Sequence, residues 1–123
     1  MRLSAREQAH QERRLIASLT KACEAGKAQL VGFAWLPHRV DYQHCPSSLR
    51  VVWVFDTQAN RDQALAAGQH ECMLALTAEA LDDADISIGL LAAHVQFDSE
   101  EQCQQADAGN WPQRLARQRT ARN

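Results

Sequence analysis

The chain has 123 residues, of which 46% are hydrophobic and 23% charged, with only five glycines and three prolines. This length fits one domain of ordinary size, and the composition excludes collagen-like, disordered and disulfide-scaffold proteins. The net charge of −2 conceals a segregation. Residues 1–50 carry eight basic and four acidic side chains, residues 51–110 one and eleven, and residues 111–123 four and none, so the balances are +4, −10 and +4.

The apolar runs and the cysteines of the sequence also indicate the cellular compartment. No run approaches the roughly 18 apolar residues of a transmembrane helix, and the first residues lack the apolar stretch of a signal peptide. The four cysteines are widely spaced and form no C-x-x-C pair. Free thiols of this kind are typical of a reducing compartment. We expect a cytoplasmic protein that makes no contact with membranes and needs no cofactor or metal.

The first predicted element is a helix over about residues 5–25. Ser4 and Glu7 have the spacing of a capping box, and apolar residues such as Leu15 and Leu19 recur at helical spacing. Gly26 is expected to end this helix, because glycine accepts the left-handed conformation common just after a helix. An apolar strand over 30–36 follows. Pro37 should interrupt that strand, and the alternation over 39–43 favours its continuation.

The next residues predict a hairpin and two helical stretches. Residues 49–55 are the clearest strand, and the turn composition of 45–48 favours antiparallel pairing with the preceding strand. Asp56 and Thr57 offer a helix cap. Helical patterns run to about residue 67 and again over about 70–82. Gly68 between them could stop one helix or kink a continuous pair, and the sequence leaves both open.

The last third predicts one more strand and two short helices. Residues 94–97 alternate like a strand, residues 99–102 resemble a capping box for an acidic helix, and residues 110–112 signal a last helix start. The order is α-β-β-α-α-β-α. It predicts a single α+β domain over residues 1–109, with a small, mainly antiparallel three-stranded sheet backed by helices. Residues 110–123 would add a basic C-terminal helix or tail.

The three tryptophans have different expected roles. Trp35 and Trp53 lie in the predicted hairpin and are expected in the core. Trp111 stands beside a predicted helix start. It is expected to staple the last helix onto the domain, with an exposed anchor for a partner as the alternative.

Histidine lies beside cysteine at Cys45 and near Cys72, which raises metal binding or a cysteine nucleophile. Neither site has the ligand spacing of structural zinc, and a nucleophile needs a thiolate stabilised by a base. The chain also lacks a P-loop, a G-x-G-x-x-G motif and a G-x-S-x-G motif. The sequence therefore leans against an enzyme. A small enzyme or metal-binding protein using Cys45, Cys72 and nearby histidines stays open as an alternative.

Three short motifs resemble ribosome-binding factor A. Pro46-Ser47-Ser48-Leu49-Arg50 resembles the turn before that family's second strand, and Ala66-Ala67-Gly68 resembles its kink between two helices. Phe97-Asp98-Ser99 resembles the end of its last strand. The resemblance implies a type II KH-like layout and binding to the small ribosomal subunit during its maturation. The chain departs from the family after the kink, where acidic residues replace an arginine-rich helix.

The leading hypothesis is a non-catalytic binding protein, associated with RNA or the ribosome. Phosphate contacts would come from eight arginines, namely Arg13, Arg14, Arg39, Arg50, Arg114, Arg117, Arg119 and Arg122. The alternative is a protein–protein module that forms a homodimer or an adaptor through its segregated charges. The leading hypothesis depends on whether the basic first and last helices share one face.

Overall fold

The computed structural model describes residues 4–45 and 47–120, with the side chains of Gln43 and residues 118–120 excepted. These residues form five helices and one small sheet, which confirms the predicted α+β class. The helices are α1 (Ala5–Gln29), α2 (Gln58–Ala66), α3 (His70–Asp83), α4 (Glu100–Asp107) and α5 (Trp111–Thr120). The strands are β1 (Phe33–Trp35), β2 (His38–Arg39), β3 (Arg50–Phe55) and β4 (Val95–Ser99).

Strand β3 is the centre of the sheet. Strands β1 and β2 pair antiparallel with it, and they are the two parts of the one strand that Pro37 was expected to interrupt. On its other side β3 pairs parallel with β4. A parallel neighbour needs a long crossover, and the segment that holds α2 and α3 supplies it. The sheet is therefore mixed, and the predicted hairpin is its antiparallel part.

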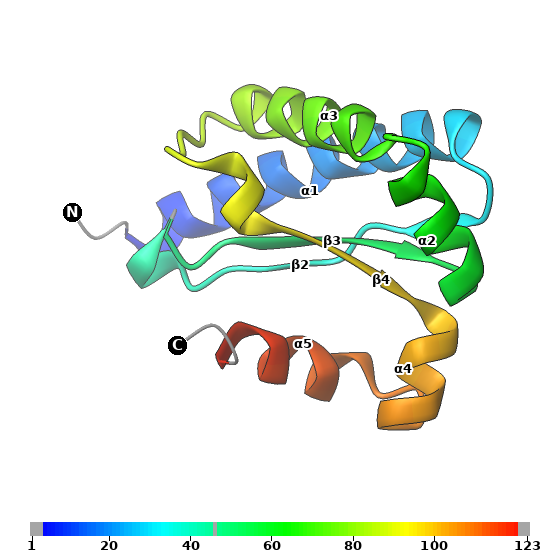
Figure 1. Cartoon of the computed structure of the whole chain (residues 1–123). Coiled ribbons are helices and arrows are strands. Elements are labelled where there is room, and N and C mark those ends of the chain that lie inside the picture. Colours follow the sequence, from blue (N-terminus) through cyan, green and yellow to red (C-terminus); the bar gives the residue numbers. More distant parts are fainter. Residues whose placement is uncertain (1–3, 46, 121–123) are drawn as a thin grey trace.

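Helices cover both faces of the sheet (Figure 1). Helices α1 and α3 lie over one face, and α5 lies over the other. Within β3, Trp53 and its neighbours two positions away join the core formed with α1 and α3. Val52 and Val54 are buried on the opposite side, since successive strand residues point to opposite faces. We call these sides the α1 face and the α5 face.

Gly26 permits the closest approach of α1 to the sheet. The prediction that it ends the helix is wrong, because α1 continues to Gln29 and the N–H of Leu30 bonds the carbonyl of Gly26. A Cβ at Gly26 would lie 2.8 Å from Cζ3 of Trp53 and 3.0 Å from Cε2 of Phe33. Glycine is thus selected here by packing and not by backbone conformation.

The N-termini of α1, α2 and α4 have the caps that the sequence predicts. Ser4 and Glu7 form the predicted capping box of α1. Thr57 accepts from the N–H of Asn60 at the start of α2, and Ser99 accepts from the N–H of Gln102 at the start of α4. Gly68 has φ +77° and separates α2 from α3, so the open choice resolves as two helices. These caps fix where the chain turns between layers.

Candidate functional site

The basic first and last helices lie on opposite faces of the sheet (Figure 1). Arg13 and Arg14 belong to α1, whereas Arg114, Arg117 and Arg119 belong to α5. The side chain of Arg119 and the whole of Arg122 lie outside the described residues. The eight predicted arginines therefore do not form one surface.

Several of these arginines form ion pairs with acids of the middle segment of the same chain. Arg14 Nη1 lies 2.8 Å from Asp85 Oδ2, and its Nη2 donates to the backbone oxygen of Asp83. Arg117 Nη2 lies 2.6 Å from Asp107 Oδ1. Part of the charge segregation is therefore neutralised within the chain, which leaves less of it for a partner.

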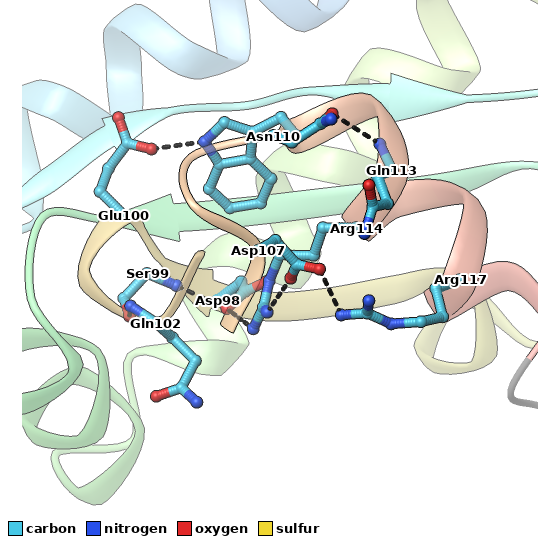
Figure 2. Close-up of polar contacts among 10 residues, drawn as sticks. Asp98, Ser99, Glu100, Gln102, Asp107, Asn110, Gln113, Arg114 and Arg117 are labelled. Atoms are coloured by element: carbon cyan, nitrogen blue, oxygen red, sulfur yellow. Dashed lines mark hydrogen bonds and ion pairs between the residues drawn. The ribbon is translucent and has the colours of Figure 1, made fainter. Parts of the chain in front are cut away.

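Arg114 anchors α5 beneath the sheet (Figure 2). Its Nε and Nη2 donate to the two carboxylate oxygens of Asp98 at 2.6 and 2.9 Å, and its Nη1 donates to Asp107 Oδ2 at 2.7 Å. Only 11% of the Arg114 side chain is exposed, and the two carboxylates are buried. The expectation of an open Arg114 contact is corrected, since burial and a bidentate pair with Asp98 occupy its guanidinium.

The two arginines beside Asp107 change the pKa of its carboxyl group. The hydrogen bond from Arg114 is the main cause that holds the pKa of the Asp107 carboxyl below its ordinary value, with a further contribution from Arg117. Arg117 differs from Arg114, because 54% of its side chain is exposed. Arg117 can therefore meet a ligand from outside, while Arg114 holds the helix.

Trp111 has the predicted stapling role. Its ring lies edge-on to Trp35, with centroids 5.6 Å apart and planes at 83°. Its indole N–H donates to Glu100 Oε1 at 2.6 Å (Figure 2). Together with Arg114, these contacts fix the first turns of α5 against β1, β4 and α4.

The prediction that Trp35 lies in the core is wrong, because this side chain is 36% exposed. Phe33 pairs with Phe55, but Trp35 pairs with Val54, so the register slips by one residue between them. Such a bulge re-aims a side chain. Trp35 therefore turns toward the α5 face at the outer edge of the sheet, where it meets Trp111.

Arg39 and Arg50 lie directly opposite each other across β2 and β3. Arg50 alternates with Val51 along β3, so both arginines belong to the α5 face. Arg50 Nη1 donates to the carbonyl of Leu49 at 2.8 Å. Arg39 Nε is buried and has no hydrogen-bond partner among the described residues. Like charges opposite each other on a sheet repel, and the carboxylates of Glu12 and Asp41 line a hollow beside Arg39.

Helix α5 runs back toward the hairpin end of the sheet that carries these two residues (Figure 1). Its later turns hold Arg117, and the helix ends at Thr120. We call Arg39, Arg50 and Arg117 the α5-face arginines. With the buried Arg114, they are the members of the predicted set, among the side chains that the structure describes, that belong to the α5 face; the guanidinium of Arg117 points to Asp107 at the end of α4.

A hollow of about 300 Å³ opens between α1 and the outer edge of β1 and β2. Ile16, which is 47% exposed, and Trp35 form part of its lining. His38 also lines the hollow. Burial lowers the pKa of His38, against the smaller opposing effect of Glu12, so the imidazole is neutral at neutral pH and adds no charge.

The fold does not bring Cys45 and Cys72 together into one site. Cys45 Sγ lies 4.0 Å from Gln11 Oε1, and Cys72 Sγ lies 3.4 Å from Gln29 Oε1. These glutamines are 18 residues apart on α1, which is about 27 Å along a helix. Burial raises the pKa of the Cys45 thiol, the opposite of what a nucleophile needs. Within residues 4–45 and 47–120 no three His, Cys, Asp or Glu side chains gather as metal ligands.

Comparison of the chain with protein-family models, curated proteins and solved structures finds no significant match. The resemblance to ribosome-binding factor A therefore stays a prediction. In the part of the chain that the structure describes, no helix combines the length and apolarity needed to cross a bilayer.

The sequence did not predict that Trp35 is exposed, nor that Arg39 and Arg50 lie opposite each other on neighbouring strands. A signal for the first was present, because Pro37 two residues later marks an irregular strand. The second follows only from the register of the hairpin, and the turn at residues 42–48 is too long for its composition to fix that register.

Proposed function

We propose that this chain is a non-catalytic, cytoplasmic RNA-binding protein whose binding surface is the α5 face. The observation that carries the proposal is the facing of Arg39 and Arg50 across the hairpin. Two guanidiniums on one face can donate several hydrogen bonds at once to a phosphate. The buried Nε of Arg39 has no hydrogen-bond partner among the described residues, so this guanidinium is not fully paired within the chain.

Helix α5 supports the same surface. Arg114 fixes the helix through buried contacts, so the exposed Arg117 is held in place by a rigid element. Arg119 and Arg122 follow in the sequence, and residues 111–123 contain no acid. A polyanion with regularly spaced phosphates, such as RNA, matches a row of arginines better than a single anion does.

Arg13 is not part of the proposed surface, because α1 covers the other face (Figure 1). It is exposed and carries the same charge as the α5-face arginines. It therefore provides a matched control. The ribosomal form of the proposal, which the resemblance implies, is one specific case of RNA binding.

Salt titration of RNA binding tests the proposal. Fluorescence anisotropy with a labelled single-stranded RNA of about 12 nucleotides gives the affinity of the natural protein, of Arg39→Gln/Arg50→Gln and of Arg13→Gln. The double variant should bind more weakly, and its slope of log K against log salt should fall by about 0.7, the contribution of the one phosphate that the two arginines share. Absence of binding at low salt, or an equal loss in Arg13→Gln, would overturn the proposal.

The alternative of charge-driven pairing between subunits has less support. Arg14 and Arg114 are paired within the chain, so fewer charges of the two basic segments remain for contact with a second copy. Sedimentation across protein concentrations distinguishes the two functions. A salt-sensitive dimer that binds no RNA would favour the alternative.

A further inference from the structure

The hollow beside Trp35 combines flat apolar walls with polar side chains. Ile16, Leu19 and Cys23 line it from α1, and Trp35 and Leu36 line it from the sheet edge. The polar part of the lining includes His38, Thr20 and the exposed Glu24 and Lys27, which carry opposite charges. Apolar walls with a few polar groups are typical of sites for small, flat ligands.

Trp35 is held in place rather than free to rotate. Trp111 contacts it edge-on, and Trp111 is itself fixed by its hydrogen bond to Glu100. A rigid aromatic side chain at the surface provides stacking area with little loss of conformational freedom. Ile16 is also exposed and lines the same hollow, so apolar side chains of α1 and of the sheet edge both contribute to it.

Trp35 lines the hollow and shares the α5 face with Arg39, because Trp35 pairs with Val54 and Arg39 pairs with Arg50 across β3. Trp35 and Arg39 lie four residues apart on the outer edge of the sheet, which is about 13 Å for extended chain. A ligand that places a flat group against Trp35 and an anion at Arg39 must be both aromatic and phosphorylated. Single-stranded RNA has this combination, because its unpaired bases can turn away from its phosphates.

We infer that the hollow beside Trp35 binds one unpaired base of the RNA, stacked on the Trp35 indole, while the phosphates lie toward Arg39 and Arg50. This inference rests on the proposed function. Lys27 offers donors and Glu24 offers acceptors to the edge of the base. Duplex RNA keeps its bases stacked inside, so the site selects single strands.

Paired titrations with single-stranded and duplex RNA of one sequence test the inference. Trp35→Ala should lower single-strand affinity about tenfold, within the range of one base–aromatic stack. The slope of log K against log salt should not change, because stacking releases no counterions. Trp35→Phe should recover most of the affinity, and duplex affinity should be the same in all three proteins.

Leu90→Ala is the matched control, since Leu90 is an exposed apolar residue at 69% and does not line the hollow. Single-stranded RNA should also quench the tryptophan fluorescence of the natural protein. In Trp35→Phe the same RNA should cause much less quenching, because the stacked tryptophan is gone. Equal affinity of Trp35→Ala and Leu90→Ala for single strands would overturn the inference.

The two proposals fail in different ways. If Arg39→Gln/Arg50→Gln weakens binding but Trp35→Ala does not, the stacking site is wrong and the RNA-binding face stands. If the natural protein and all of its variants leave the anisotropy of the labelled RNA unchanged, the proposed function itself is wrong. If the natural protein self-associates and Trp35→Ala abolishes this without affecting RNA, the hollow is a contact between copies, and the inference is overturned.

Discussion

At the scale of single residues, Gly26 lies where α1 approaches the buried indole of Trp53. Gly26→Ala would place a methyl group 2.8 Å from that ring, so we expect the free energy of unfolding to fall by about 1–3 kcal/mol. At Gly89 a new Cβ would meet nothing within 4 Å, and Gly89→Ala should be neutral or slightly stabilising. Urea denaturation of both variants measures the difference. Equal effects would show that the close approach at Gly26 is not as described.

A second residue-scale prediction concerns the polar atom of Trp53. Its indole N–H donates to the buried hydroxyl of Thr77 at 3.0 Å, and that hydroxyl donates to the carbonyl of Met73. Thr77→Val leaves the indole N–H unpaired, which should cost about 1–3 kcal/mol of unfolding free energy.

Thr20 provides the control for that change, because its exposed hydroxyl bonds the carbonyl of Ile16 in the same way within α1. Thr20→Val should cost about 0.5 kcal/mol or less. Thermal or urea unfolding gives both values, and a similar cost for the two threonines would contradict the role assigned to Thr77.

Side-chain caps made the helix starts predictable at the scale of elements. The signals at Ser4 and Ser99 are local, so the sequence alone places them well. The end of α1 was misplaced, because Gly26 has a partner in Trp53 that is distant in sequence. The bulge at Trp35 was missed for the same kind of reason, since strand register depends on the neighbouring strand.

The attachment of α5 depends on Arg114. Arg114→Gln leaves Asp98 and Asp107 buried without their main partner, which should cost about 3–5 kcal/mol or release the helix. Arg117→Gln, at an exposed side chain, should cost about 1 kcal/mol or less. Limited proteolysis within α5, together with urea unfolding, measures both. Arg114→Gln behaving like Arg117→Gln would contradict the anchoring role.

The same anchor predicts acid sensitivity. Hydrogen bonding from Arg114 lowers the pKa of Asp107 below its ordinary value of 3.8 in the folded chain. The stabilisation is therefore complete above that value and is lost as the pH falls through the lowered one. Urea midpoints from about pH 6 to about pH 3 should show the difference between the natural protein and Asp107→Asn shrinking with acid. A constant difference would contradict this linkage.

At the scale of the whole molecule, the charge segregation found in the sequence has two outcomes. Some charges meet inside the chain, as in the pairs of Arg14 with Asp85 and Arg114 with Asp98. Others gather on the α5 face, where Arg39 and Arg50 lie opposite each other. Counting charges along the sequence detects the segregation, but only the three-dimensional structure shows which arginines pair with acids of the same chain.

Two of the eight predicted arginines, Arg39 and Arg50, are thus placed side by side, and Arg117 lies on the same face. The sequence did not predict the parallel pairing of β4 with β3, because this pairing depends on how α2 and α3 cross over the sheet. That crossover sets which side of β4 faces α5 and so places Asp98 beside Arg114. The geometry of the proposed surface therefore depends on contacts between distant segments.

The proposed function requires that RNA contact the α5 face and not the face covered by α3. Titration of ¹⁵N-labelled protein with single-stranded RNA, followed by the backbone amide signals, tests this most directly. We predict shifts at Trp35, Arg39, Arg50 and the later turns of α5, with the signals of α3 unchanged. Shifts centred on Arg13 and α3, or no shifts at low salt, would contradict the account.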